Sequence, residues 1–357
     1  MFGIIAFDLA DSALDPEPVV REKDMTVLQR WLFAGLTVFA LCSATNAEPV
    51  RIRLAWIAPI SNWGSLLLEK KELARHLGQS YLLEPVRFSG SSPMINALAN
   101  GELEIANLAF STLPIAIQNA GLDDLRVIAD ELQDGVPGFY SQEYMVRSDG
   151  PIKIVEDLKD KVVASLAAGT AIDIGIRAML RRHGLENQRD YTMVETPLPA
   201  MRSMLAEKKV DLIAAVPPFS FDPELRRIAR PLFFHREVSG ETQLLMWTAR
   251  KGFIDNNRPA MVDFMEDSLR ITRWFLNPAN HQEVMEICGR IAKQPPERYD
   301  WVFTERDYYR DPNMVPELSA LQKNVDLVKD LGLFKGDVYV NKYADLSILQ
   351  EATARLK

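Results

Sequence analysis

Residues 88–106 read FSGSSPMINALANGELEIA, and this stretch contains the boundaries of a strand, a helix and a second strand. Ser92 is the predicted N-cap, because its hydroxyl can accept a hydrogen bond from a free amide of the first turn. Pro93 suits the first helical position, and Gly101 suits the left-handed residue that follows a last turn. The stretch therefore predicts a short helix between two strands, which is the alternation of an α/β fold.

The loop before this helix consists only of small residues, Ser89-Gly90-Ser91-Ser92. Small side chains leave the backbone amides at the positive end of a helix open to an anion or a polar ligand. A helix that is capped but binds no ligand would have the same sequence features. If this loop is considered alone, such a helix is the commoner case. The loop is therefore open to two interpretations, a ligand site or a plain cap.

A weak internal repeat favours the ligand site. The residues of the first copy are Met94, Leu98 and Ala99, and they recur at the same spacing as Met201, Leu205 and Ala206. Each copy runs from a helix through a charged turn into a strand. Two lobes built on one plan would produce this pattern.

The composition is that of a globular protein with small-molecule or protein partners. The chain has 357 residues, of which 47% are hydrophobic, and this is enough for two α/β domains with separate cores. The formal net charge is −8. The longest basic cluster in the sequence is Arg181-Arg182-His183, and such a short cluster argues against nucleic acid as a partner.

Residues 1–47 are predicted to be a leader. An apolar run of 11 residues, 31–41, follows Arg30 and precedes small residues that suit cleavage after Ala47. A membrane anchor needs about 20 apolar residues, so this run is too short. Residues 1–24 contain six acidic residues, unlike a positively charged leader. We therefore expect Met25 to be the true start and 25–47 to be the signal peptide.

A lipid anchor on Cys42 is the alternative to cleavage after Ala47. The large residue before it, Leu41, disfavours this alternative. Cleavage would leave Cys288 as the only cysteine. An exported chain with one cysteine has no intramolecular disulfide, so its stability must come from the two cores.

The rest of the chain alternates between strand and helix patterns, which predicts mostly parallel sheets. Strands are predicted at 50–57, 81–88, 127–131, 144–147, 161–166, 210–216 and 244–248. Helices are predicted at about 65–77 and, toward the C-terminus, at 263–277, 281–293, 317–331 and 346–356.

The segment QDGVPG at 133–138 is turn-forming and marks a crossing into a second lobe. We predict a first lobe of residues 48–137 and 245–357 and a second lobe of residues 138–244. In the second lobe, Thr170 and Asp173 form a capping pair at the start of an amphipathic helix. This helix also follows a strand through a loop of small residues.

The segments at 88–98, 101–106, 144–147 and 155–164 (FSGSSPMINAL, GELEIA, YMVR and VEDLKDKVVA) resemble the taurine, alkanesulfonate and nitrate group of ABC transporter solute-binding proteins. This group is related to the thiamine-pyrimidine synthase-like proteins, and the resemblance covers residues 49–350. It implies the two-lobed periplasmic binding protein fold of type II, with two strand crossings. It also implies a periplasmic monomer that delivers its ligand to an ABC permease and its ATPase.

The resemblance further implies that loops after the strands contact the ligand in the cleft between the lobes. The positions that correspond to these loops are Asn62, Trp63, Ser91, Ser92, Phe110, Ser111, Gly169, Thr170, Ala171 and Phe219. We expect aromatic walls from Trp63, Phe110 and Phe219, with Tyr140 and Trp247 next. We expect a small organic anion, a sulfonate or a carboxylate, held between the helix ends at Ser92 and Thr170.

Enzymatic function is disfavoured by the sequence. It contains no G-x-S-x-G, Walker or H-E-x-x-H motif, and the cysteine-rich motif of the pyrimidine synthases is missing from a chain that keeps only Cys288. We therefore predict a transport protein with no catalytic residue, metal or cofactor. The alternative is an enzyme or binder that acts on a pyrimidine-type thiamine precursor.

Overall fold

The computed structural model describes residues 48–356. The predicted start at Met25, the signal peptide at 25–47 and the alternative at Cys42 all lie outside the described residues. Pro49–Lys357 form one compact unit. Within the described part of this unit, no helix has both the length and the apolar character that crossing a membrane requires.

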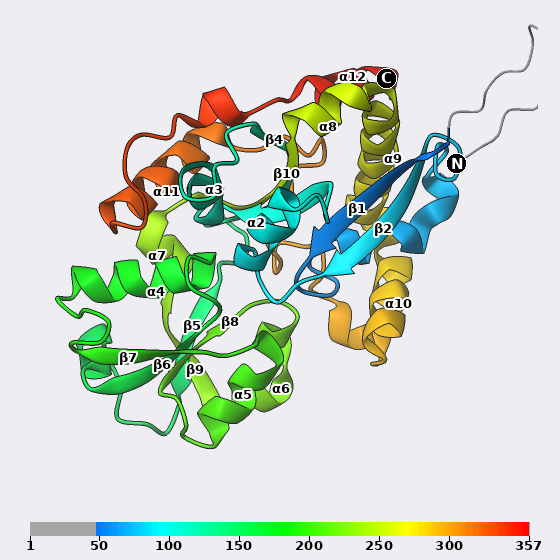
Figure 1. Ribbon diagram of the computed structural model, residues 1–357. Helices are drawn as coiled ribbons and strands as arrows, with labels where there is room; N and C mark the ends of the chain where they lie inside the picture. Colours follow the sequence, from blue (N-terminus) through cyan, green and yellow to red (C-terminus); the bar gives the residue numbers. More distant parts are fainter. Residues whose placement is uncertain (1–47, 357) are drawn as a thin grey trace, which may run out of the picture. The chain divides into compact units, whose positions relative to one another are not determined.

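Two five-stranded sheets organise the chain (Figure 1). The first has the order β2-β1-β3-β10-β4, and the second has the order β7-β6-β8-β5-β9. The strands of the first sheet are β1 (Val50–Trp56), β2 (Tyr81–Arg87), β3 (Ile105–Ala109), β4 (Leu125–Asp134) and β10 (Thr242–Arg250). Those of the second are β5 (Glu143–Arg147), β6 (Lys161–Ser165), β7 (Tyr191–Glu195), β8 (Leu212–Ala215) and β9 (Ala229–Phe234).

Each sheet is mostly parallel, as predicted, because one strand runs against the other four. In the first sheet β1 pairs in parallel with β2 and β3, whereas β10 is antiparallel to β3 and β4. In the second sheet β5 is antiparallel to β8 and β9. Strands β5 and β10 each follow a crossing. Each therefore enters its sheet from the other lobe and runs antiparallel to its neighbouring strands.

The chain passes between the sheets twice, from β4 to β5 and from β9 to β10. We propose that the lobe boundaries lie at these two crossings. The predicted division, with 48–137 and 245–357 in the first lobe and 138–244 in the second, remains a proposal. At the first crossing, the buried carboxylate of Asp134 accepts hydrogen bonds from Ser141 Oγ and from the Gln142 amide at 2.9 Å. The connecting backbone is thereby fixed to the end of β4.

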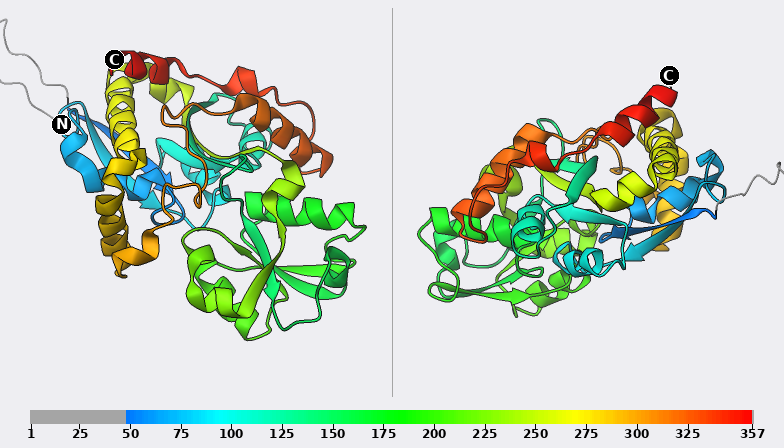
Figure 2. Two further views of the ribbon diagram at one scale, coloured as in Figure 1. Left: turned by 180° about the vertical axis from the view of Figure 1, so that it is seen from behind. Right: turned by 45° about the horizontal axis from the view of Figure 1, so that its top comes forward.

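Helices cover the faces of both sheets, and the later ones pack on the first sheet (Figure 2). The helices before β10 are α2 (Ser92–Ala99), α3 (Thr112–Gln118), α4 (Ala171–Arg182), α5 (Leu198–Ala206), α6 (Pro223–Ile228) and α7 (His235–Ser239). Those after it are α8 (Lys251–Asn256), α9 (Arg258–Leu276), α10 (His281–Ala292), α11 (Leu318–Asp330) and α12 (Ser347–Arg355). The four helices predicted toward the C-terminus are confirmed as α9 to α12.

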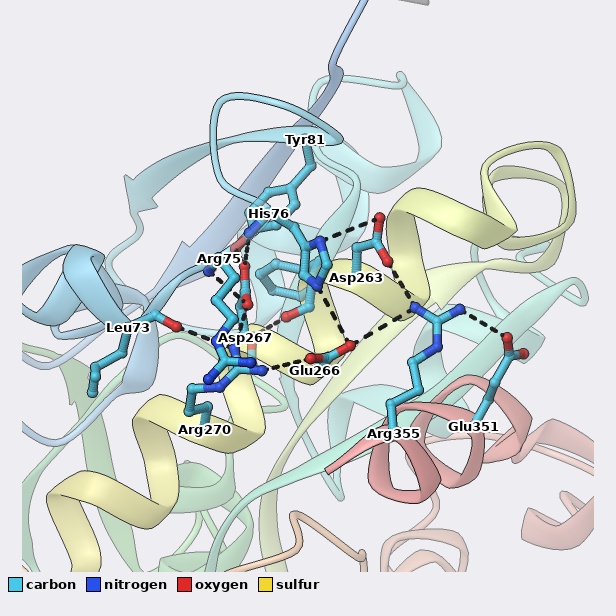
Figure 3. A network of polar contacts seen from close by, with 12 residues as sticks. Leu73, Arg75, His76, Tyr81, Asp263, Glu266, Asp267, Arg270, Glu351 and Arg355 are labelled. Carbon is cyan, nitrogen blue, oxygen red and sulfur yellow. Dashed lines mark hydrogen bonds and ion pairs between the residues drawn. The ribbon is translucent and has the colours of Figure 1, made fainter. Parts of the chain in front are cut away.

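The helix predicted at about 65–77 is wrong. The chain there forms two 3₁₀ segments, Trp63–Ser65 and Leu67–Leu73, with a kink at Lys70. The amides of Arg75 and His76 do not continue a helix because they donate to the buried carboxylate of Asp267 on α9, at 2.9 and 2.8 Å (Figure 3). A partner from α9, more than 190 residues away in the sequence, therefore decides the backbone of this segment.

Candidate functional site

A cavity of about 70 Å³ lies between the two lobes. Its walls are mostly apolar and come from both lobes, with Ile57, Ala109, Leu132 and Leu244 on the first and Leu166, Ile172, Leu198 and Val216 on the second. Its polar lining residues are Ser61, Asn62, Ser91, Gln142, Thr170 and Tyr308. The described residues around the cavity include no Lys, Arg, His, Cys, Asp or Glu.

The N-termini of two helices from different lobes face this cavity. Ser91 is the N-cap of α2, and Thr170 is the N-cap of α4. Both N-caps line the cavity, as do the first two residues of α4, Ala171 and Ile172. The first amides of a helix have no partner within it and carry partial positive charge, so this end of the cleft favours anions and hydrogen-bond acceptors.

Ser91, not Ser92, is the N-cap of α2, and it makes no capping bond with its side chain. The Ser92 hydroxyl instead donates to the Ala168 carbonyl of the other lobe at 2.9 Å. Ser92 is therefore a contact between the lobes, because the opposing loop comes close enough to compete for its hydroxyl.

The predicted capping pair of α4 is confirmed. Thr170 Oγ1 accepts from the Asp173 amide at 3.5 Å, and the Asp173 carboxylate accepts from the Gly169 amide at 2.9 Å. Gly169 has a φ of +81°, and a Cβ there would lie 2.9 Å from the side chain of Ile115. Gly169 therefore permits close approach of the lobes, and its amide is already occupied.

Tyr308 lines the cavity and carries a buried hydroxyl that the protein leaves unused. This side chain is 4% exposed, and its hydroxyl has no hydrogen-bond partner among the described residues. Burial raises the pKa of Tyr308 well above its usual value, so the hydroxyl remains a donor. Ser91 is 2% exposed and likewise makes no capping bond. A buried hydroxyl left without a partner is unfavourable, and a ligand would satisfy it.

The loop at 58–63 is held rigidly below the cavity. Asn62 Oδ1 accepts from the amides of Ile57 and Ala58 at 3.0 and 2.8 Å. The buried Glu131 accepts from the Trp63 amide at 2.7 Å and from the indole of Trp247. Burial raises the pKa of Glu131 to about 7.

A buried ion pair supports the same loop from the C-terminal segment. Arg310 donates to Asp307 at 2.9 Å and to the Ser61 carbonyl at 2.9 Å. Ser61 in turn donates from Oγ to the Pro217 carbonyl of the second lobe at 2.8 Å. The segment that contains Tyr308 thus positions one wall of the cavity.

The structure brings only part of the predicted site to the cavity. Among the predicted ligand contacts, Asn62, Ser91, Thr170 and Ala171 line it, and Trp63, Ser92, Phe110, Ser111, Gly169 and Phe219 do not. Phe219 lines neighbouring hollows on the outer side of the cleft. Sequence reasoning missed Gln142 and Tyr308, because no local pattern marks either residue.

The expected aromatic walls are largely core residues. Trp63 is 1% exposed and stacks on Phe303, with ring centroids 5.2 Å apart. Phe110 is fully buried and packs near the ring of His235, and Trp247 is fully buried beside Phe264. These large side chains fill the interior around the strands, so the walls of the cavity are aliphatic instead.

A second polar cluster lies away from the cleft, between the 74–81 segment and α9 (Figure 3). His76 faces Asp263 with Nδ1 at 3.9 Å and Glu266 with Nε2 at 3.4 Å. Arg355 pairs with Asp263 at 2.8 Å, and Arg270 pairs with Glu266 at 2.5 Å. The two nitrogens of His76 face different carboxylates that arginines already neutralise, so this is an ion-pair network to which we assign no metal.

The lobes are also in contact through aromatic and charged side chains. Phe221 of the second lobe stacks on Trp301 of the first, with centroids 4.4 Å apart and an interplanar angle of 10°. The neighbouring Asp222 lies 3.9 Å from Arg298. Together with the Ser61 and Ser92 bonds, these contacts describe a closed cleft.

A sequence model of the NMT1-like family matches residues 45–289. No curated protein matches the chain. Among solved structures, the alkanesulfonate-binding protein SsuA from Xanthomonas axonopodis pv. citri bound to MOPS has a TM-score of 0.65 at 19% identity, and the match covers 84% of this chain and 99% of that chain. The periplasmic nitrate-binding protein NrtA from Synechocystis PCC 6803 has a TM-score of 0.67 at 15% identity, covering 87% and 90%.

An enzyme also shares this fold. The desulfurization enzyme DSZB has a TM-score of 0.62 at 14% identity, and the match covers 86% of this chain and all of that chain (100%). At these identities the likeness establishes the fold alone. The predicted two-lobed α/β fold is confirmed.

Proposed function

Because the chain belongs to the NMT1-like family, we propose that it is the periplasmic solute-binding component of an ABC importer. The observation that carries this proposal is the convergence of two helix N-termini, one from each lobe, on a single cavity. The fold it shares with the binding proteins SsuA and NrtA supports the same proposal. The partners would be a small molecule and the permease with its ATPase, and the protein would act as a monomer.

The proposed ligand is a small organic anion with a sulfonate or carboxylate head. None of the described residues that line the cavity is a cation, so the negative charge would be met by free helix amides and by the hydroxyls of Ser91, Thr170 and Tyr308. Each helix end contributes about 0.3–2 kcal/mol to the binding of an anion, depending on exposure. The raised pKa of Glu131, near 7, lowers the average negative charge beneath the cavity at neutral pH.

This arrangement would couple binding to closure. An anion between the two N-termini interacts with both only when the lobes are shut. A ligand shifts a conformational equilibrium only by its differential affinity for the two states, and here that difference is built into the site. The closed shape would then be the signal read by the permease.

A direct test is calorimetric titration of the protein with methanesulfonate, together with native mass spectrometry for a ligand retained through purification. We expect Ser91→Leu to weaken binding at least tenfold, about 1.4 kcal/mol, because the side chain would fill the cavity beside the α2 N-terminus. Ser203→Leu is the matched control, because Ser203 is exposed on α5. Equal affinity for methanesulfonate in the unchanged protein, Ser91→Leu and Ser203→Leu would contradict the proposed site.

The second candidate function is an enzyme that acts in the same cleft, and the shared fold of DSZB favours considering it. Against it, the cavity lining within residues 48–356 includes no Cys, His, Asp or Glu to act as nucleophile or general base. Incubation with benzenesulfinate or with a phosphorylated pyrimidine, followed by chromatography, discriminates between the two. A binding protein would leave each compound chemically unchanged. Multiple turnovers of either compound would show that the chain is an enzyme.

A further inference from the structure

A second hollow of about 300 Å³ adjoins the cavity on the outer side of the cleft. The two spaces share Ile57 and Leu198 in their walls. The outer hollow is also lined by both lobes, with Arg87, Phe88 and Ser89 from the first and Pro197, Pro199 and Phe219 from the second. Four of its lining residues, Arg87, Ser89, Pro197 and Pro199, are exposed, so the hollow continues the cleft toward the surface.

The volumes of the two spaces indicate which part of a ligand each space can hold. Pockets for organic ligands usually measure about 300–1,000 Å³, whereas one water needs about 10–15 Å³ of comparable space. The inner cavity of about 70 Å³ is therefore large enough for an anionic head and too small for a whole organic molecule. A ligand with a carbon skeleton has to extend past Ile57 and Leu198 into the outer hollow.

Among the residues that the structure describes, Arg87 is the only charged one that lines the outer hollow. Its guanidinium carbon lies 5.3 Å from the ring centroid of Trp56, and it forms no ion pair with any acid in residues 48–356. Two arginines on the neighbouring strand differ in this respect. Arg51 pairs with Glu84 at 2.6 Å, and Arg53 pairs with Glu104. Arg87 is thus a cation held against an aromatic ring at the mouth of the cleft, with its hydrogen bonds available to a ligand.

We propose that the ligand is a dianionic organic acid with an apolar middle. Its head would occupy the inner cavity at Ser91, Thr170 and Tyr308. Its apolar or aromatic body would lie in the outer hollow against Phe88 and Phe219. A second acidic group would pair with Arg87, whose planar fork matches a carboxylate. This inference rests on the proposed function and specifies the class of molecule that the same site would take.

The test is a series of three ligands titrated by calorimetry, namely methanesulfonate, benzenesulfonate and 4-sulfobenzoate. They represent the head alone, the head with a body, and the head with a body and a second acid. We expect benzenesulfonate to bind at least tenfold more tightly than methanesulfonate, because the ring is removed from water. We expect 4-sulfobenzoate to gain about a further threefold to fivefold, since Arg87 is exposed. That last gain should shrink as salt is added.

Two variants assign each gain to its residue. Phe219→Ala should weaken both aromatic ligands and leave methanesulfonate unchanged. Arg87→Ala should remove only the advantage of 4-sulfobenzoate over benzenesulfonate. The matched control is Arg236→Ala, because Arg236 is also exposed over an aromatic ring, that of Phe234 at 5.5 Å, and lines neither space.

The outcomes separate this inference from the proposed function. If methanesulfonate binds as tightly as the other two, the protein binds anions but the outer hollow takes no part, and the inference is overturned alone. If 4-sulfobenzoate keeps its advantage in Arg87→Ala, the role of Arg87 is overturned. If none of the three binds, the inference and the proposed anionic ligand both fail.

Discussion

At the scale of single residues, the proposed site uses a hydroxyl that the protein itself leaves without a partner. Tyr308 is buried, lines the cavity and has no partner for its hydroxyl among the described residues. Its role was not predictable from the sequence, because it lies in the C-terminal segment, far from the loops that follow strands. Thr170 was predictable, because a capping residue and its partner Asp173 lie within one turn.

We expect Tyr308→Phe to separate binding from stability. The variant removes a hydroxyl that has no partner in the free protein, so the melting temperature without ligand should stay the same or rise slightly. A hydrogen bond to a charged group contributes about 1.5–3 kcal/mol, so affinity for benzenesulfonate should fall at least tenfold. Calorimetry and thermal melting measure the two quantities. Tyr81→Phe is the control with the reverse outcome, because the Tyr81 hydroxyl donates to Asp267 at 3.1 Å, away from the cleft.

The buried acid beneath the cavity makes stability depend on pH. Burial raises the pKa of Glu131 from 4.5 to about 7, so the folded state binds a proton that the unfolded state has lost over this interval. A raised carboxyl pKa contributes stability below pH 4.5, and that contribution is lost as the pH rises toward 7. We therefore expect Glu131→Gln, compared with the unchanged protein, to gain about 1–3 kcal/mol between pH 5 and pH 8.

Chemical denaturation of both proteins at the two pH values measures this difference. The substitution also alters the bonds to Trp63 and Trp247, and this effect is present at both pH values, so it cancels in the comparison. A difference between the proteins that stays constant from pH 5 to pH 8 would show that Glu131 is ionised throughout.

At the scale of elements, local signals decided what the sequence could predict. The N-terminus of α4 has its cap, its first-turn partner and its apolar face within 12 residues, and it was predicted correctly. The segment after Trp63 was predicted as a helix because its composition allows one. Its backbone is set by Asp267 on α9, and no pattern within the segment contains that information. The direction of β10 depends on the crossing that precedes it, so it was also missed.

We expect Asp267→Ala to release the 74–81 segment from α9. The fully buried carboxylate accepts from the amides of Arg75 and His76, and it pairs with Arg270 at 2.7 Å. Removing one side of a buried charged network destabilises a protein by about 3–5 kcal/mol. Denaturant titration measures the loss, and hydrogen exchange should show faster exchange at residues 74–81.

Asp255→Ala is the matched control for this prediction. Asp255 pairs with Lys251 at 2.6 Å on the surface of α8, where both side chains are about half exposed. Such surface pairs contribute about 0–1 kcal/mol. A loss of similar size in both variants would mean that the Asp267 network does not fasten the segment.

At the scale of the whole molecule, the closed cleft is held partly by contacts that touch no ligand. Phe221 stacks on Trp301 across the lobes, and Arg306 lies over the same phenyl ring at 5.6 Å. Phe221 and Trp301 line a groove separate from the inner cavity. Apparent affinity equals intrinsic affinity multiplied by the populated fraction of the binding-competent state. Contacts that favour closure should therefore strengthen binding from a distance.

This coupling predicts that a change at Phe221 alters ligand affinity through closure. An aromatic pair contributes about 0.5–1.5 kcal/mol beyond its buried area, so Phe221→Ala should weaken the binding of benzenesulfonate about twofold to tenfold if the open state dominates without ligand. Small-angle scattering should show a larger radius of gyration for the free variant, and the same compact form at saturating ligand. Phe253→Ala is the control, because Phe253 is equally half-buried but packs within the first lobe. It should lower the melting temperature and leave the affinity intact, because it removes no contact between the lobes. Unchanged affinity in Phe221→Ala would mean that the ligand alone closes the cleft.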